Sequence, residues 1–177
     1  TSRTPIREAM RKLESQGLIQ IFPKRYAQVA NFSDKEIKDI GMIRISLDIL
    51  SIKLVAIYGS KAELLNLKSI AEQCLEAFNN NDGVQRRKLD SDFHKELCRI
   101  SKNKLLFDMQ EDLSLKIQFI LMHNDFKSVN DKEHLNQHIQ IVDSLIEGNI
   151  EQALKLDIQH LSEFYCLDID SPIEFFL

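Results

Sequence analysis

Apolar residues recur every three or four positions along most of this 177-residue chain, and residues that interrupt helices are scarce. Only five glycines and three prolines occur, so few positions force a helix to end. Two of the apolar patterns begin with a capping box, one formed by Ser33 and Glu36 and the other by Ser60 and Glu63. The sequence therefore predicts a mainly α-helical fold with six helices, at about 34–58, 61–79, 82–101, 104–124, 130–147 and 150–167. The short connections between them favour an antiparallel six-helix bundle.

The start of the chain follows a different pattern. A helix from Thr1 to Gly17 is indicated by Thr4 and the proline after it, which supply a capping hydroxyl and a first-turn proline. Two short β-prone runs, 18–22 and 26–30, follow and are joined by a Pro-Lys-Arg turn. We therefore expect a helix and a β-hairpin ahead of the bundle.

Charge is divided unevenly along the chain. Residues 1–31 carry six basic and two acidic side chains, a net charge of +4, although the whole chain has a formal net charge of −4. Residues 32–177 therefore carry −8. A basic head on an acidic body is typical of a polyanion-binding module attached to a domain that does not touch the polyanion.

The first helix has the composition of a DNA recognition helix. Arginines supply guanidinium groups for phosphates and guanine edges, hydroxyls bind phosphate oxygens, and the opposite stripe of the helix is apolar. The candidate DNA-binding residues are Ser2, Arg3, Thr4 and Arg7 on the helix, with Lys24 and Arg25 at the hairpin turn. The alternative is a basic helix that is only a solvated surface.

Three of the five histidines and one aspartate form a candidate metal site. Asp90 lies four residues before His94, so a helix places the two side chains on one face. His138 and His160 lie at similar distances on either side of the predicted turn at 148–149, so an antiparallel helix pair brings them side by side. A carboxylate with neutral imidazoles suits Zn²⁺, Ni²⁺ or Mn²⁺. The alternative, for each histidine taken alone, is an ordinary polar residue of the core or surface.

Two further charged residues, Arg44 and Asp92, are not assigned as metal ligands. Arg44 could pair with Asp48 four residues further along its helix, or reach the pocket and neutralise a bound carboxylate. Asp92 lies on another side of its helix from Asp90 and is interpreted as a solvated charge.

Cysteine usage and hydropathy indicate a cytoplasmic protein without a membrane segment. Cys74, Cys98 and Cys166 are widely spaced without a CxxC pair, which favours reduced thiols. No apolar run approaches the roughly 20 residues that a membrane span needs, and no signal peptide is indicated.

Two segments resemble parts of one known family of bacterial regulators. Residues 2–19, which begin Ser-Arg-Thr-Pro-Ile-Arg-Glu-Ala-Met-Arg, resemble the recognition helix of the GntR family of bacterial regulators. Residues 33–167 resemble the FCD effector domain of the FadR subfamily, on the motif Leu-Asp-Ser-Asp-Phe-His at 89–94 and on the segments 138–149 and 153–161. The resemblance implies a divalent metal ion held by Asp90, His94, His138 and His160, an effector contact by Arg44, and DNA contacts by Arg3, Thr4, Arg7, Lys24 and Arg25.

The same resemblance implies partners and a division of the chain. We expect a homodimer that binds palindromic operator DNA, senses a small organic acid and acts as a repressor. Because a winged helix-turn-helix has two helices ahead of its recognition helix, we expect roughly 45 residues of a domain of about 70 to be missing before Thr1, and DNA binding by the 177 residues alone to be poor. The predicted regions are a partial winged helix-turn-helix at 1–31, an FCD-type effector-binding domain at 33–169 and a C-terminal tail at 170–177.

Two other functions are consistent with parts of the pattern. A metal-dependent helical-bundle enzyme, a hydrolase or isomerase, could activate water at the same ligands. No HExxH or comparable arrangement supplies a general base for it, however. An interaction module without any site would make the four ligand positions a coincidence. The sequence therefore favours a ligand-responsive transcriptional regulator that is not an enzyme.

Overall fold

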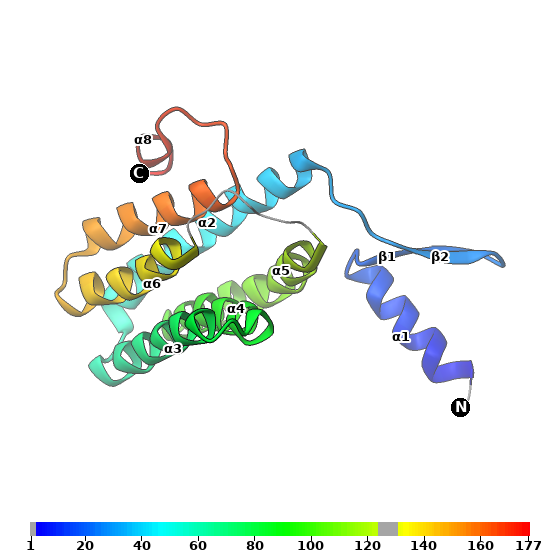
Figure 1. Ribbon diagram of the computed structural model, residues 1–177, viewed down its shortest axis with the longest axis horizontal. Coiled ribbons are helices and arrows are strands. Elements are labelled where there is room, and N and C mark those ends of the chain that lie inside the picture. Colours follow the sequence, from blue (N-terminus) through cyan, green and yellow to red (C-terminus); the bar gives the residue numbers. More distant parts are fainter. Residues whose placement is uncertain (1–2, 124–130) are drawn as a thin grey trace.

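The computed structural model describes residues 3–123 and 131–177, and in that part of the chain it contains eight helices and one β-hairpin (Figure 1). The elements are α1 (Arg3–Ser15), β1 (Ile19–Phe22), β2 (Tyr26–Val29), α2 (Asp34–Tyr58), α3 (Lys61–Asn79), α4 (Gly83–Ile100), α5 (Lys104–His123), α6 (Asp131–Ile146), α7 (Ile150–Phe164) and α8 (Pro172–Phe176). The predicted mainly helical fold is confirmed: α2 to α7 form the six-helix bundle, and a helix and hairpin precede it.

Both predicted capping boxes begin helices of the bundle. The Ser33 side chain accepts a hydrogen bond from the backbone of Glu36 at the start of α2, and the Glu36 side chain accepts one from the Ser33 backbone. Ser60 and Glu63 make the same reciprocal pair at the start of α3. Each box satisfies backbone amides that have no partner within the helix, so it fixes where the helix begins.

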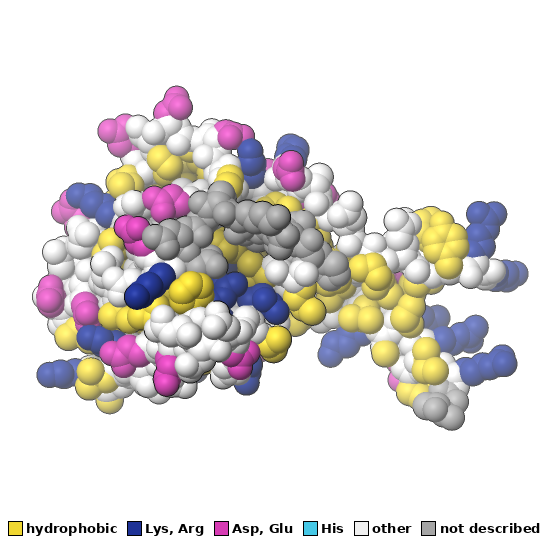
Figure 2. Space-filling view, viewed as in Figure 1, with side chains coloured by type: hydrophobic (Ala, Val, Ile, Leu, Met, Phe, Trp, Pro, Cys, Tyr) yellow, Lys and Arg dark blue, Asp and Glu magenta, His cyan; other side chains and the backbone are white. Residues whose placement is uncertain are grey.

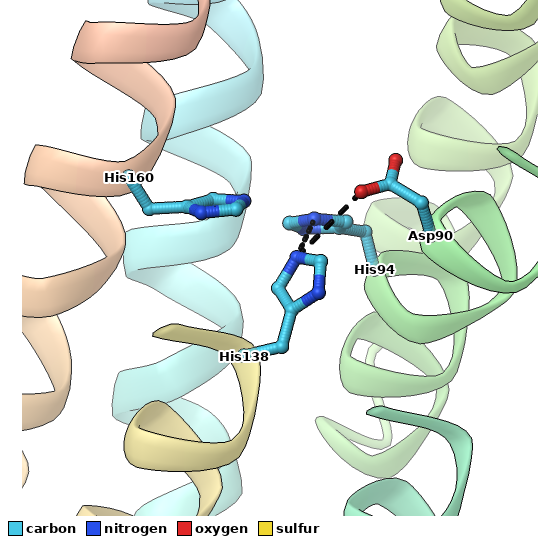
Figure 3. A group of neighbouring side chains, drawn as sticks. All are labelled: Asp90, His94, His138 and His160. Carbon is cyan, nitrogen blue, oxygen red and sulfur yellow. Dashed lines mark hydrogen bonds and ion pairs between the residues drawn. The ribbon is translucent and has the colours of Figure 1, made fainter. Parts of the chain in front are cut away.

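The bundle is built so that α2 and α3 each contact several other helices. Helix α2 packs against α4, α5 and α7, whereas α3 packs against α4 and α6. The core between them consists of fully buried aliphatic and aromatic side chains, among them Ile45, Ile52, Leu67, Phe93 and Ile158. This packing brings α4 and the consecutive helices α6 and α7 around one point in the interior (Figure 3).

Gly41 allows α2 to approach the end of α7 closely. A Cβ atom at this position would lie 2.5 Å from Cγ of Tyr165, which is closer than carbon atoms pack. Tyr165 is therefore able to lie flat against the α2 backbone, and it is buried there. Its hydroxyl accepts a hydrogen bond of 2.9 Å from Arg44 Nη1, which holds the arginine beside the bundle interior.

Residues 3–29, called the head below, stand beside the bundle rather than within it (Figure 1). Strands β1 and β2 pair antiparallel with Ile19 opposite Val29. Phe32, just after the head, packs edge-on against Phe119 of α5 at a ring distance of 6.0 Å. A groove of about 560 Å³ separates the end of α1 from α2 and α5; it is lined by Lys12, Ser15, Gln16, Ile43, Leu47, Met109, Asp112, Leu113 and Lys116.

The C-terminal tail predicted at 170–177 contains a short helix that the sequence analysis did not predict. Pro172–Phe176 forms the short helix α8, and Ile173 and Phe176 pack against the bundle core. Five residues are too few to show a helical period, so the pattern gave no signal. Among the described helices, none is both long and apolar enough to cross a membrane.

Candidate metal centre

The four predicted ligands lie together inside the bundle (Figure 3). Asp90 and His94 come from α4, His138 from α6 and His160 from α7, and one donor atom from each lies within 4.8 Å of the other three. Nε2 of His138 is 3.2 Å from Nε2 of His94 and 3.7 Å from Oδ1 of Asp90. All four residues are buried.

Local helix geometry accounts for this convergence. Asp90 and His94 are one turn apart on α4, so both point from the same face. Helices α6 and α7 pack against each other, and the turn between them contains Gly148 at φ +75°, a conformation that favours glycine. His138 and His160 therefore lie at matching depths on two adjacent helices, with ring centroids 4.4 Å apart.

Burial disfavours the protonated form of three histidines at the cluster, His134, His138 and His160. Removal from water lowers the pKa of His138 and of His160 well below the usual value, and lowers that of His134 to about 4. Burial raises the pKa of Asp90, but the positive charge of Arg44 is the main effect that opposes burial, and the pKa of Asp90 falls to about 2. Asp90 is therefore ionised and His138 and His160 are neutral, the protonation states in which these groups bind divalent metal ions.

Arg44 lies at the edge of this cluster. Its Nη2 is 3.6 Å from Oδ2 of Asp90, and its Nη1 donates to Tyr165. Burial disfavours the charge, yet Tyr165, Asp90 and Asp48 together raise the pKa of Arg44 above its usual value. Arg44 was predicted either to pair with Asp48 or to reach the pocket. In the structure the carboxylate of Asp48 contacts His94, and Arg44 lies beside Asp90 instead.

Asp48 and Asp157 are buried carboxylates that the sequence interpretation did not assign to the site. Oδ2 of Asp48 lies 2.5 Å from Nδ1 of His94, and donor atoms of Asp48, His94 and Asp157 form a second group within 4.8 Å of one another. Burial, followed by the charge of Asp48, raises the pKa of Asp157 well above its usual value. A signal was present in the sequence, since both aspartates interrupt apolar helical stripes.

Two further polar residues of α6 surround His160. Its Nδ1 lies 3.1 Å from Oε1 of Gln137. His134, one turn before His138, stacks on the ring of His160 with centroids 3.7 Å apart and an interplanar angle of 17°. His134 is buried, but it is not part of the group of four donor atoms.

The predicted DNA-binding residues within the described region are all exposed on the head. Arg3, Thr4 and Arg7 lie on α1, and Lys24 and Arg25 lie at the hairpin turn. Basic side chains gather on the head, whereas acidic side chains are spread over the bundle (Figure 2). The sixth predicted residue, Ser2, lies outside the described residues.

Residues 39–163 match the FCD domain model. The chain therefore belongs to the FCD-domain group of GntR-family transcriptional regulators. It is similar to the HTH-type transcriptional regulator YdhC of Bacillus subtilis, with 28% identity over 91% of this chain and 72% of that protein. The HTH-type transcriptional repressor RspR of Escherichia coli is also 28% identical, over 92% of this chain and 72% of its own length.

A solved structure supports the fold. The structure of E. coli McbR/YncC superposes with a TM-score of 0.79, covering 92% of this chain and 82% of that one, at 19% sequence identity. At this identity the similarity shows a common architecture.

Proposed function

We propose that this chain is a regulator of the FadR subfamily in which the bundle senses a small carboxylate through a bound divalent metal ion. The observation that carries the proposal is the convergence of four buried donor groups from three helices. Buried polar groups are costly unless they share a partner, and a divalent cation is the partner that one carboxylate and three neutral imidazoles suit. Zn²⁺, Ni²⁺ and Mn²⁺ are the candidates.

Asp90, His94, His138 and His160 would hold the ion, which would supply positive charge for an anionic effector. Arg44 would supply a second cation, since its guanidinium already lies 3.6 Å from Asp90 and is anchored by Tyr165. A carboxylate between the ion and Arg44 would be held from two sides. We therefore assign Arg44 to effector binding.

We further propose that the head binds palindromic operator DNA as part of a homodimer. Exposed apolar residues recur at heptad spacing along α2, where Ile43, Leu50 and Ile57 are 54%, 43% and 69% exposed. Helix α5, packed beside α2, adds Leu105 and Met109, which are 70% and 50% exposed. Such a stripe supports self-association through α2 and α5.

Repression in the cytoplasm is the proposed mode of action. The relative RspR is named a transcriptional repressor, which supports repression rather than activation as the mode of action of this chain. The two relatives described above are named as transcriptional regulators, which supports this function over a metal-dependent enzyme. Buried free thiols at Cys74 and Cys98 are consistent with a reducing compartment.

Helix α5 supplies a route from the metal centre to the head. Its Gln110 lies 3.5 Å from Asp48 beside the site, and its Phe119 contacts Phe32 at the base of the head. A change in the position of α5 on effector binding would therefore move the head. This is a coupling between two distinct sites through one packed element.

Thermal unfolding in the presence of carboxylates tests the sensor function. Zn²⁺ is expected to raise the Tm, and one member of a panel of small carboxylic acids at about 100 times its Kd is expected to raise it by roughly a further 5–10 °C. A chelator should abolish the second shift, and the carboxamide analogue of the active acid should give none. The absence of any shift with divalent cations would contradict a metal-containing sensor.

Gel-shift titration of the full-length protein on its upstream DNA tests the head. Arg7→Ala should weaken binding by about 10- to 100-fold, because a guanidinium contact to a guanine edge or phosphate is lost. Lys155→Ala removes the same charge from α7 of the bundle, outside the head, and should leave the affinity unchanged. Equal losses in the two variants would indicate a nonspecific effect of net charge.

A further inference from the structure

His94 is contacted at both ring nitrogens. Its Nε2 faces the cluster, 3.2 Å from Nε2 of His138, while its Nδ1 lies 2.5 Å from Oδ2 of Asp48. Asp48 belongs to α2 and is fully buried. Because a carboxylate oxygen accepts the hydrogen bond from a ring N–H, this contact places the proton on Nδ1 of His94 and leaves the lone pair on Nε2.

Asp48 is itself held in place. Its Oδ1 receives a contact of 3.5 Å from Nε2 of Gln110 on α5. Helix α2 is fixed against α4 by core packing, so the carboxylate cannot follow the imidazole if the ring rotates. The orientation of His94 is thus set by two helices that contribute no donor atom to the group of four.

His160 has a weaker version of the same support. Its Nδ1 lies 3.1 Å from Oε1 of Gln137, a neutral acceptor, which again leaves Nε2 free. Nδ1 of His138, by contrast, is buried without a hydrogen-bond partner among the described residues. Among the described residues, His94 is therefore the only one of the three histidines with a carboxylate at its far ring nitrogen.

We infer that Asp48 is a positioning residue of the metal centre, which fixes the tautomer and orientation of His94 so that its Nε2 faces the cluster. The inference rests on the proposed metal site and extends it to a residue on α2. Carboxylates that accept a hydrogen bond from the far nitrogen of a ligating histidine typically contribute 10- to 100-fold to metal affinity.

Asp157 provides a matched comparison. It is as fully buried as Asp48 and its donor atom belongs to the same group as His94, but neither of its oxygens has a hydrogen-bond partner among the described residues. The alternative is that Asp48, His94 and Asp157 together bind a second cation. The 2.5 Å contact between Asp48 and His94 disfavours this alternative, because the nitrogen involved already holds a proton.

The isosteric variants Asp48→Asn and Asp157→Asn separate these possibilities in the full chain. Zn²⁺ affinity is measured by competition with a chromophoric chelator, and the number of bound ions by metal analysis. Asp48→Asn is expected to lower the affinity by at least about 10-fold, whereas Asp157→Asn should stay within about threefold of the wild type. One ion should bind per chain in all three proteins.

Proton NMR of the Co²⁺-loaded proteins supplies a readout that a general loss of stability would not change. Exchangeable Nδ1–H protons of histidines bound through Nε2 appear as strongly shifted signals. The His94 signal should persist in the wild type and in Asp157→Asn, and should shift or disappear by solvent exchange in Asp48→Asn. If Asp48→Asn does not fold, Gln110→Leu, which removes the contact to Oδ1 of Asp48, tests the same orientation, and a shift of the His94 signal is expected.

The possible outcomes distinguish the inference from the proposed function. A wild-type chain that binds no metal would overturn the proposed function itself. A wild-type chain that binds metal, with unchanged affinity and unchanged N–H signals in Asp48→Asn, would overturn only the role of Asp48. Two ions per chain, one of them lost in Asp157→Asn, would show that the three residues form a second metal site.

Discussion

Replacing His138 with glutamine is expected to lower the Zn²⁺ affinity by about 100-fold or more. Structural zinc sites with four ligands bind with about 10–16 kcal/mol, so the loss of one ligand costs on the order of 3 kcal/mol. His138 lies at the centre of the cluster, with contacts to both His94 and Asp90. Isothermal titration or chelator competition on purified protein would measure the change.

His134→Gln is the matched control for this substitution. His134 lies one turn earlier on the same helix and is also buried, but its donor atoms fall outside the group of four. This variant should bind Zn²⁺ with nearly the wild-type affinity. Equal losses of Zn²⁺ affinity in both variants would contradict the assignment of His138 as a ligand. Thermal unfolding of the metal-free variants would show whether either substitution had damaged the fold.

Local rules of helix geometry are enough to bring the four candidate ligands close together in pairs. The spacing of Asp90 and His94 fixes a common helix face, and one short turn fixes the relative depth of His138 and His160. The same reasoning predicted the bundle helices and their caps. The tertiary structure was needed only to show that the pair on α4 meets the pair on α6 and α7.

Residues that support the ligands were harder to predict, because their partners are distant in sequence. Asp48 and His94 are 46 positions apart, and Arg44 and Tyr165 are 121 positions apart. Sequence spacing offered Asp48 as a neighbour of Arg44, but α2 and α4 pack so that the carboxylate meets an imidazole instead. Short-range rules cannot choose between two partners when one of them is supplied by another helix.

The stability of the metal-free protein is expected to fall steeply between pH 6 and pH 5. Burial lowers the pKa of His134 to about 4 and those of His138 and His160 well below the usual value, so the unfolded chain takes up three protons that the folded chain rejects. A lowered histidine pKa gives stability that is present above about pH 6.5 and is lost as the pH falls.

Asp157 opposes this trend by one proton. Burial and the charge of Asp48 raise its pKa well above the usual value, so it contributes stability at low pH that is lost as the pH rises. The net uptake on unfolding is thus about two protons, and the free energy of unfolding should fall by roughly 3 kcal/mol per pH unit. Urea unfolding in the presence of a chelator, followed by circular dichroism at several pH values, measures this slope.

Two single substitutions should change the slope in opposite directions. His134→Gln removes one of the three rejected protons, which should reduce the slope to about 1.4 kcal/mol per pH unit. Asp157→Asn removes the opposing group, which should increase it to about 4 kcal/mol per pH unit. A wild-type slope near zero, or the same slope in both variants, would show that the buried histidines are not held neutral by the bundle. That result would remove the main electrostatic reason to expect these imidazoles to be available for a metal ion.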